Sequence, residues 1–195
     1  LSIRRQRQMC IRDSNYYKEN SEILYDFIDA LLKDISFLKE DNLNFSLINI
    51  ISPYLGFSLI NKEDIQFLNY FIKKLKNIYP NSKFSLNLYF LKYYQNLEFF
   101  NELNVDILTL DLCYGDREKI IEKIKDLNFD LGLGLIDSNI SLIEEPEYLK
   151  KEILRICKIV KKDKIYLTTS SDLDRLPYEL ACEKINVIGK LLKII

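Results

Sequence analysis

Apolar residues along the chain alternate between helical spacing and short continuous runs. Residues 21–41 carry apolar side chains at steps of three and four, a pattern that predicts an amphipathic helix. Residues 45–51 form a continuous apolar run, which predicts a strand covered on both of its faces. A second helix is expected to begin at Asn61, because Asn61 and Asp64 form a capping-box pattern, and to end before Pro80.

The same alternation continues to the C-terminus. Further strands are predicted at 84–90, 106–111, 131–136 and 164–168, and further helices at 93–103, 116–127, 146–160 and 177–194. Gly132 and Gly134, in the fourth strand, would let a helix approach it closely. Strands that are each followed by a helix indicate a parallel sheet with right-handed crossovers.

Two fold families fit repeated βα units, the doubly wound sheet and the (β/α)8 barrel. Neither a GxGxxG nor a GxxxxGK[ST] sequence occurs, which weakens the case for a nucleotide-binding doubly wound sheet. We therefore expect an α/β fold that forms the C-terminal part, about five βα units, of a TIM (β/α)8 barrel. Five units cannot close such a barrel, so further N-terminal units are expected to be missing from this sequence.

The first fourteen residues, LSIRRQRQMCIRDS, differ from the rest of the chain. They have neither helical nor strand periodicity, and they resemble a translated sequencing adapter. We expect residues 1–14 to be an artefact and residues 15–195 to be the partial barrel domain. The alternative is a basic arm for nucleic acid, built on Arg4, Arg5 and Arg7.

Composition is ordinary for a soluble globular protein, with 48% hydrophobic and 29% charged residues. The formal net charge of −1 gives no general field that would attract nucleic acid or an anionic membrane. The longest apolar region, 45–60, is interrupted by Asn49, Pro53 and Gly56 and is too broken to span a membrane. We expect a cytoplasmic protein with neither a nucleic-acid nor a membrane partner.

Histidine is absent, and the four cysteines include no CxxC pair. A closed zinc site or a disulfide framework is therefore not expected, and the commonest general base is missing. Cys113 falls near the end of a predicted strand, but no basic partner is visible nearby, so an inert thiol is expected there.

Polar residues follow the predicted strands, at the edge where a parallel barrel builds its active site. Asp111 is a candidate ligand-binding residue. An alternative with equal support is a structural role, in which its carboxylate accepts hydrogen bonds from loop amides. For Asp137 and Asn139 the alternative is turn formation, at which Asp and Asn excel. Ser170, Ser171 and Asp172 would line the same mouth, or would form a loop cap for the last helix.

An aromatic run follows the second strand: Tyr89, Phe90, Tyr93, Tyr94, Phe99 and Phe100. Such a run could stack against a pterin ring, because ligand pockets are partly aromatic. At this spacing the bulk of it is expected to be core.

Three segments resemble the cobalamin-independent methionine synthase family. NVDILTLDLCYG at 104–115 is similar to the family's VDxLxLDLxxG unit, and LGLIDSNI at 133–140 is similar to its glycine-rich strand. KIYLTTSSDLDRLP at 164–177 resembles the family's last βα unit, in which a cysteine that binds zinc precedes a Leu-Pro pair. The segments occur in the family's order, and the resemblance extends over roughly residues 15–192.

The resemblance implies specific positions for the family's zinc ligands. A His, a Cys, a Glu and a second Cys would correspond here to Asn87, Tyr89, Asp111 and Ser171. Of these only Asp111 could bind a metal, so no metal site is expected. Ile51 stands where the family has a carboxylate that helps to hold the amino-acid substrate. The LDL sequence at 110–112 instead resembles the family's zinc-free N-terminal barrel.

Three functional hypotheses follow from this resemblance. In the first, the protein is an accessory half that binds the methyl donor, for which a methyl-tetrahydropteridine is a candidate. It would present this donor to a separate zinc-bearing core protein, where the methyl group is transferred to homocysteine. In the second, it is a barrel enzyme of altered, zinc-independent chemistry that uses Asp111 and Asp137. In the third, it is a degenerate, non-catalytic paralogue. No cofactor is expected to be bound.

Overall fold

The computed structural model describes residues 20–57, 61–89, 97–162 and 164–195. The adapter-like segment 1–14 lies outside these residues. The elements within the described ranges follow one another as α2 (Asn20–Glu40), β1 (Leu47–Ile51), α3 (Pro53–Phe57), α4 (Lys62–Ile78), β2 (Lys83–Leu88), η1 (Leu97–Glu102), β3 (Ile107–Asp111), α5 (Arg117–Ile124), β4 (Asp130–Ile136), α6 (Pro146–Val160), β5 (Ile165–Thr169) and α7 (Tyr178–Ile194). The predicted alternation of helices and strands is confirmed.

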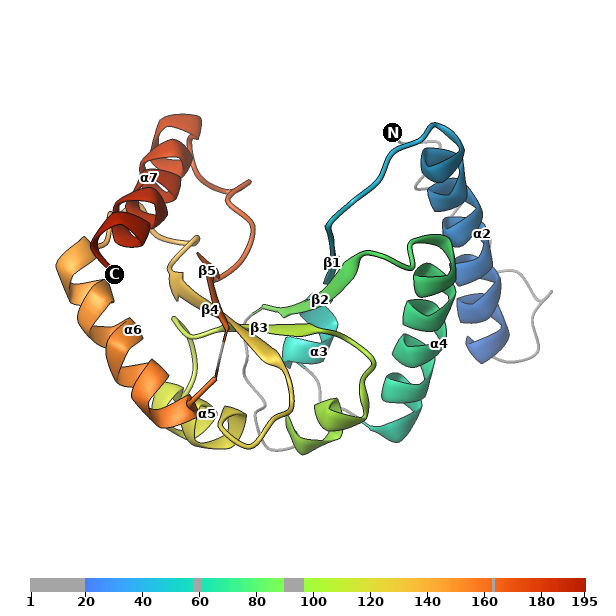
Figure 1. The fold of residues 1–195 in the computed structure, drawn as a ribbon, viewed down its shortest axis with the longest axis horizontal. Helices are drawn as coiled ribbons and strands as arrows, with labels where there is room; N and C mark the ends of the chain where they lie inside the picture. The colour runs from blue at the N-terminus through green and yellow to red at the C-terminus, as the bar shows by residue number, and fades with distance from the viewer. Residues whose placement is uncertain (1–19, 58–60, 90–96, 163) are drawn as a thin grey trace.

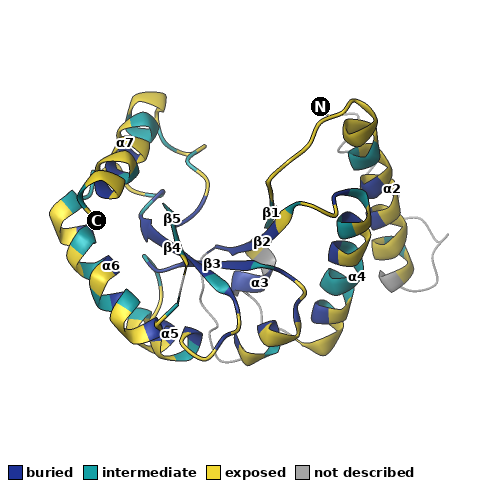
Figure 2. Ribbon diagram, in the orientation of Figure 1, coloured by how far each residue is buried: buried dark blue, intermediate teal, exposed yellow. Residues whose placement is uncertain are grey.

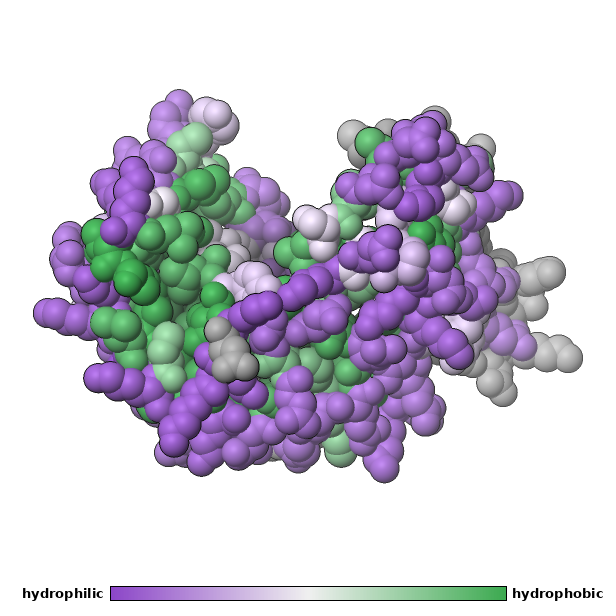
Figure 3. Space-filling view, in the orientation of Figure 1, coloured by the Kyte–Doolittle hydropathy of each residue, from purple (hydrophilic) through white to green (hydrophobic). Residues whose placement is uncertain are grey.

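The strands form one five-stranded sheet in the order β1-β2-β3-β4-β5, and every neighbouring pair is parallel. The sheet curves, and the helices lie around its outer side in an arc that runs from α2 to α7 (Figure 1). The arc is open between α7 and α2, and the space-filling view is hollowed there (Figure 3). The fold is therefore the expected α/β arrangement, part of a barrel.

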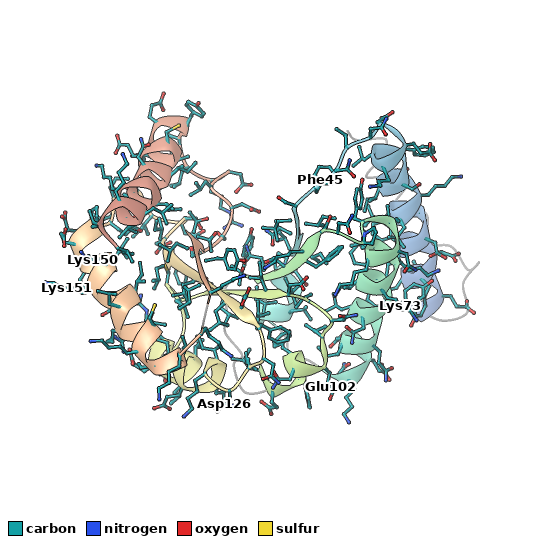
Figure 4. All side chains as sticks on the ribbon, in the orientation of Figure 1. Phe45, Lys73, Glu102, Asp126, Lys150 and Lys151 are labelled. Atoms are coloured by element: carbon teal, nitrogen blue, oxygen red, sulfur yellow. The ribbon has the colours of Figure 1, made fainter. Side chains whose placement is uncertain are left out.

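The two faces of the sheet differ in chemistry. The face toward the helices is apolar and buried, with Phe84, Leu86 and Leu88 on β2 and Leu108 and Leu110 on β3 (Figure 2). Burial of these side chains under the helices supplies the main stabilisation of the fold. Charged side chains such as those labelled on α4, η1 and α6 lie on the outer rim of the arc (Figure 4).

The face toward the hollow is largely polar. Ser85 and Asn87 of β2 lie beside Ile107 and Thr109 of β3 in the strand register, and Asp111 follows on the same face of β3. Side chains alternate between the faces of a strand, so these residues share the inner wall. All of these polar side chains are buried, although the arc is open.

Two sequence expectations about the strands and helices are corrected. The first strand is not covered on both faces, because Leu47 and Ile51 are each 44% exposed. β1 lies at the edge of the sheet and pairs only with β2 among the described strands, so its other side has no neighbour there. The helix expected at 93–103 is a 3-10 helix over Leu97–Glu102, and residues 90–96 lie outside the described part of the chain.

Local sequence signals set several helix ends as expected. Asn61 caps α4, and the Asn61 and Asp64 side chains each accept a hydrogen bond from the other's backbone amide. Asp116 accepts a hydrogen bond from the backbone amide of Lys119 at the start of α5. Within the described ranges, no helix is long and apolar enough to cross a lipid bilayer.

Candidate functional site at the carboxyl ends of the strands

The inner wall is packed tightly at the level of Thr109. Its hydroxyl lies 3.2 Å from the Ser85 hydroxyl. A methyl group added at Gly132 would lie 2.2 Å from Thr109 Oγ1, so only glycine leaves space for that side chain. Gly132 was expected to let a helix approach the strand, but it makes room for the Thr109 side chain on the inner wall instead.

Asn87 lies above this layer and is 6% exposed. Its side-chain oxygen is buried without a hydrogen-bond donor. Buried acceptors in folded proteins are almost always satisfied, because leaving one unpaired costs about 1–3 kcal/mol. Asn87 is therefore the residue of the inner wall that most clearly lacks a partner within the described protein.

Asp111 ends β3 and is fully buried. Its Oδ1 accepts a 2.8 Å hydrogen bond from the backbone amide of Cys113. The carboxylate thus supports the turn after β3, as the structural alternative expected.

Tyr89 follows the end of β2 and is 5% exposed. Its hydroxyl donates a 2.5 Å hydrogen bond to Asp172 Oδ1 in the loop after β5. Burial, together with this bond and the negative charge of Asp172, raises the pKa of the Tyr89 hydroxyl well above its usual value. The structure thus brings together two candidate residues that are far apart in the sequence.

Asp137 and Asn139 form a turn after β4. Asp137 Oδ1 accepts hydrogen bonds from the backbone amide of Asn139, at 2.9 Å, and from the hydroxyl of Tyr114, at 3.0 Å. The first bond is the Asx-turn geometry that the alternative interpretation of these residues expected. Asn139 Nδ2 is buried and has no acceptor in good hydrogen-bond geometry, although its side chain interacts with the Tyr114 hydroxyl and acts to lower the pKa of that hydroxyl.

Three buried serines join the loops after β4 and β5. Ser138 Oγ bonds the hydroxyls of Ser170, at 3.0 Å, and Ser171. The Ser138 amide also donates to Ser170 Oγ at 3.1 Å. The Ser171 hydroxyl is therefore hydrogen-bonded to Ser138, and it does not cap the N-terminus of α7, which has no side-chain cap.

A buried ion pair supports the same loops, and sequence reasoning missed it. Lys184 of α7 is fully buried, and its Nζ lies 3.1 Å from both Glu144 oxygens and 2.7 Å from the carbonyl oxygen of Leu142. Glu144 Oε1 also accepts a 2.7 Å bond from the Asp137 amide. The sequence did contain one signal for this ion pair: Lys184 lies at helical spacing from the buried Val187. A lysine on an apolar helix face needs a buried partner.

Cys113 lies next to Asp111 and is partly buried. Burial and the neighbouring charges of Asp111, Asp137 and Glu144 raise the pKa of its thiol to about 12, against a smaller opposing effect of Arg117. A thiol with so high a pKa is a poor nucleophile and a poor metal ligand at neutral pH.

The positions that the resemblance assigns to zinc ligands do not offer zinc's usual donors. Among the residues that the structure describes, no three His, Cys, Asp or Glu side chains lie where they could hold one metal ion. The Tyr89 hydroxyl donates to Asp172, and the Ser171 hydroxyl bonds Ser138. Structural and catalytic zinc sites need at least three N, S or carboxylate ligands, and here only Asp111 is of that kind.

Comparison with known proteins gives a consistent set of relatives. No family model matches the chain. The chain is 22% identical over 187 residues to a methionine synthase of Thermococcus kodakarensis, covering 93% of this chain and 52% of that protein. It is 24% identical over 175 residues to a methionine synthase of Saccharolobus solfataricus, covering 88% of this chain and 50% of that protein.

Solved structures give the same result for the fold. A B12-independent methionine synthase from a Shewanella species, in complex with selenomethionine, matches 92% of this chain and 56% of its own with a TM-score of 0.73 at 18% identity. A putative B12-independent methionine synthase from Listeria monocytogenes has a TM-score of 0.64 at 14% identity, over 93% of this chain and 58% of its own. The chain spans about half the length of the relatives it matches.

Proposed function

On the premise that this chain is a relative of the cobalamin-independent methionine synthases, we propose that it is a cytoplasmic, zinc-independent, methyl-donor-binding half. It binds a methyl-tetrahydropteridine at the strand ends and presents it to a separate zinc-bearing core protein. That core protein supplies the activated homocysteine. The methyl transfer serves methionine biosynthesis.

One observation supports this proposal: the residues at the positions of the family's zinc ligands bond to other protein side chains. The hydroxyl of Tyr89 is hydrogen-bonded to Asp172 and that of Ser171 to Ser138, so the strand ends form a hydrogen-bonded polar wall. Such a wall suits an organic ligand with its own donors and acceptors better than it suits a metal ion.

The wall has the elements that a flat, polar ring needs. Asn87 Oδ1 offers a buried acceptor and Asn139 Nδ2 a buried donor. The rings of Tyr89 and Tyr114 are both fixed at the mouth by hydrogen bonds to carboxylates, which leaves little freedom to lose on binding. A reduced pteridine presents amide and amino groups on one edge and a flat face to stack on.

The need for a partner follows from the chemistry of the acceptor thiol. Homocysteine must react as a thiolate, and metal coordination is one way to deprotonate a thiol at neutral pH. The chain has no histidine, and the thiol of Cys113, at the mouth, holds its own proton tightly. The thiolate is therefore expected to form on another protein.

Of the other hypotheses, an acid–base pair of Asp111 and Asp137 has less support. Both carboxylates accept bonds from nearby backbone amides, Asp111 from Cys113 and Asp137 from Asn139. Each has a local structural use.

Isothermal titration calorimetry with N5-methyl-tetrahydrofolate tests donor binding. We expect one site with micromolar affinity, and about tenfold weaker binding for Asn139→Leu, since a lost hydrogen bond that leaves a polar group unpaired costs about 1–3 kcal/mol. Asn128→Leu, an exposed asparagine at the opposite ends of the strands, is the matched control. The absence of binding to the folded wild type would refute the proposal.

A methyl-transfer assay tests the need for a partner. Homocysteine, N5-methyl-tetrahydrofolate and this chain should give no methionine until a zinc-bearing methionine synthase core is added. Methionine formed by this chain alone would contradict the accessory role and would favour the enzyme hypothesis.

A further inference from the structure

We propose that a cavity between α2, α4 and the free side of β1 binds a neutral aliphatic molecule of medium chain length that has a carbonyl oxygen at one end. Tyr79 supplies the hydrogen-bond donor for that oxygen. The site goes beyond the methyl-donor proposal and does not depend on it, because the described residues that line it include none from the loops after the strands.

The cavity has the size and the lining of a small-molecule site. Its volume is about 420 Å³, and ligand sites of about 300–1,000 Å³ with mainly apolar walls are usual in proteins. Apart from Asn49 and Tyr79, the described lining is apolar. It includes Leu31, Ile35 and Leu38 of α2, Ile48 of β1, and Phe71 and Leu75 of α4.

The packing of α2 leaves this apolar wall open. α2 and α4 lie side by side at one end of the arc (Figure 1). α2 buries Ile28 and Leu32, whereas Leu31 and Leu38 remain 38% and 41% exposed. A ligand that removes this apolar surface from water is stabilised by the hydrophobic effect.

The hydroxyl of Tyr79 gives the cavity one polar requirement. Tyr79 directly follows α4, lines the cavity and is 2% exposed. Its hydroxyl is buried and has no hydrogen-bond partner within the described part of the chain. Buried hydroxyls are almost always paired, because the bonds that they lose to water have to be replaced. A phenol is a hydrogen-bond donor, so the ligand brings the acceptor.

The surrounding charges favour a neutral acceptor over a carboxylate. A buried carboxylate needs a paired cation. The Lys39 ammonium lies 5.2 Å from the centre of the Tyr79 ring, but it is exposed and donates to Asn44 Oδ1 at 2.5 Å. The acidic residues Glu40 and Asp41 follow Lys39 directly, so this end of α2 does not attract an anion.

A strand of another polypeptide fits these observations less well. β1 is an edge strand among the described strands, and an added strand would bond to it in the plane of the sheet. The carbonyl groups of that strand would point along this plane, whereas Tyr79 lies at the end of α4, in the helix layer. Such a strand would therefore leave the Tyr79 hydroxyl unpaired.

Ligand-observed NMR titrations with the full chain test the site. The probe is 2-octanone, compared with the shorter 2-pentanone and with octanoate, which has the same chain length and a negative charge. We expect 2-octanone to bind at least tenfold more strongly than 2-pentanone, since each buried CH₂ group contributes about fourfold. Octanoate should bind at least tenfold more weakly than 2-octanone, because its charge would be buried without a partner.

Tyr79→Phe tests the hydrogen bond, because it removes the hydroxyl and keeps the ring. It should weaken 2-octanone binding about tenfold. Tyr70→Phe is the matched control. Tyr70 lies within α4, outside the described lining, and its hydroxyl donates to Asp29 Oδ1 at 3.3 Å, so binding should not change. Urea unfolding without ligand should find Tyr79→Phe at least as stable as the wild type, since the lost hydroxyl is unpaired.

A second pair of variants tests the cavity itself. Leu31→Trp places a large side chain at the cavity wall and should abolish saturation transfer to 2-octanone. Leu24→Trp, also on α2 and 47% exposed but outside the described lining, should leave it unchanged. Circular dichroism shows whether each variant folds.

Four results would overturn the site. They are equal binding of 2-octanone and 2-pentanone, octanoate binding as strong as that of 2-octanone, unchanged 2-octanone binding in Tyr79→Phe, and a dimer of the ligand-free chain that Leu31→Trp dissociates. The last result, from sedimentation, would mean that a second copy covers the cavity. Because N5-methyl-tetrahydrofolate is titrated separately, failure of this site and failure of the methyl-donor proposal are distinguishable.

Discussion

The hydroxyl of Tyr89, directly after β2, donates a 2.5 Å hydrogen bond to the carboxylate of Asp172, 83 residues later in the chain. This bond joins the second strand of the sheet to the loop after the fifth and crosses the mouth of the inner wall. It therefore ties together the two ends of the candidate site.

Removing the negative charge at the acceptor end of this bond should be visible in the titration of Tyr89. Burial, the bond to Asp172 and nearby negative charge all raise the pKa of the hydroxyl. Asp172→Asn removes the charge, so the pKa of Tyr89 should fall toward its usual value of about 10. The titration is followed by phenolate absorbance. The part of the signal that is absent from the Tyr89→Phe variant belongs to Tyr89 and not to the other tyrosines.

Asp174→Asn is the matched control for that titration, because the charge of Asp174 has the smallest of the effects on Tyr89. Its shift should be the lesser one. Equal shifts in the two variants would mean that the bond to Asp172 does not form in solution.

Loss of Lys184 should destabilise the protein strongly. Lys184→Met leaves Glu144 and the carbonyl oxygen of Leu142 without their buried cation, a change that typically costs about 3–5 kcal/mol. The exposed pair of Lys119 and Asp116 provides the control, and Lys119→Met should change the free energy of unfolding far less, because solvent screens that pair. Urea unfolding measures both free energies, and similar values would contradict the buried pair.

Two glycines should respond in opposite ways to alanine. A methyl group at Gly134 would lie 2.8 Å from the carbonyl oxygen of Leu110 and 3.0 Å from that of Thr169, and backbone atoms of a central sheet cannot easily yield. We expect Gly134→Ala to cost about 1–3 kcal/mol. Gly189 has no atom within 4 Å of the added position. It lies inside α7, so Gly189→Ala should stabilise the protein by about 1 kcal/mol.

Thermal unfolding of the two glycine variants measures these changes side by side. A tolerated Gly134→Ala would show that β3 and β5 approach β4 less closely than the structure has them.

The thiol of Cys113 should resist alkylation. With a pKa of about 12, it is almost entirely protonated at about pH 8, so iodoacetamide should label it only after unfolding. Intact-mass analysis of native and urea-treated protein, with Cys113→Ser as the control, locates the slow site. Rapid native labelling at Cys113 would contradict its environment.

The same thiol gives a pH dependence of stability. Its pKa is higher in the folded protein than the usual value of about 8.5, so the folded state retains a proton that the unfolded state releases. Stability should therefore fall as pH rises from about 8.5 toward 12. Cys113→Ala should flatten that decline.

Local patterns in the sequence were sufficient for most of the fold. Apolar spacing predicted α2, α4 and α6, and the Asn61–Asp64 pattern located the start of α4. Each of these signals acts within one or two helical turns. The exposure of β1 was not predictable in this way, because an apolar run does not say how many neighbours the strand has.

The candidate site was predicted only in part. Strand-end position identified Asp111 and Asp137, because parallel strands bring their carboxyl ends to one edge. The pairs Tyr89–Asp172 and Glu144–Lys184 join residues 83 and 40 positions apart, and no local pattern specifies such a contact. Asn87 entered through family resemblance alone, and its missing partner became visible only with its neighbours in place.

Equilibrium dialysis against zinc tests the central claim, that a metal-independent polar wall stands at the family's ligand positions. It compares the wild type with one triple variant that combines Asn87→His, Tyr89→Cys and Ser171→Cys. This variant adds three zinc ligands to the carboxylate of Asp111. We predict no stoichiometric zinc in the wild type and close to one zinc per chain in the variant. One tightly bound zinc in the wild-type protein would contradict the account.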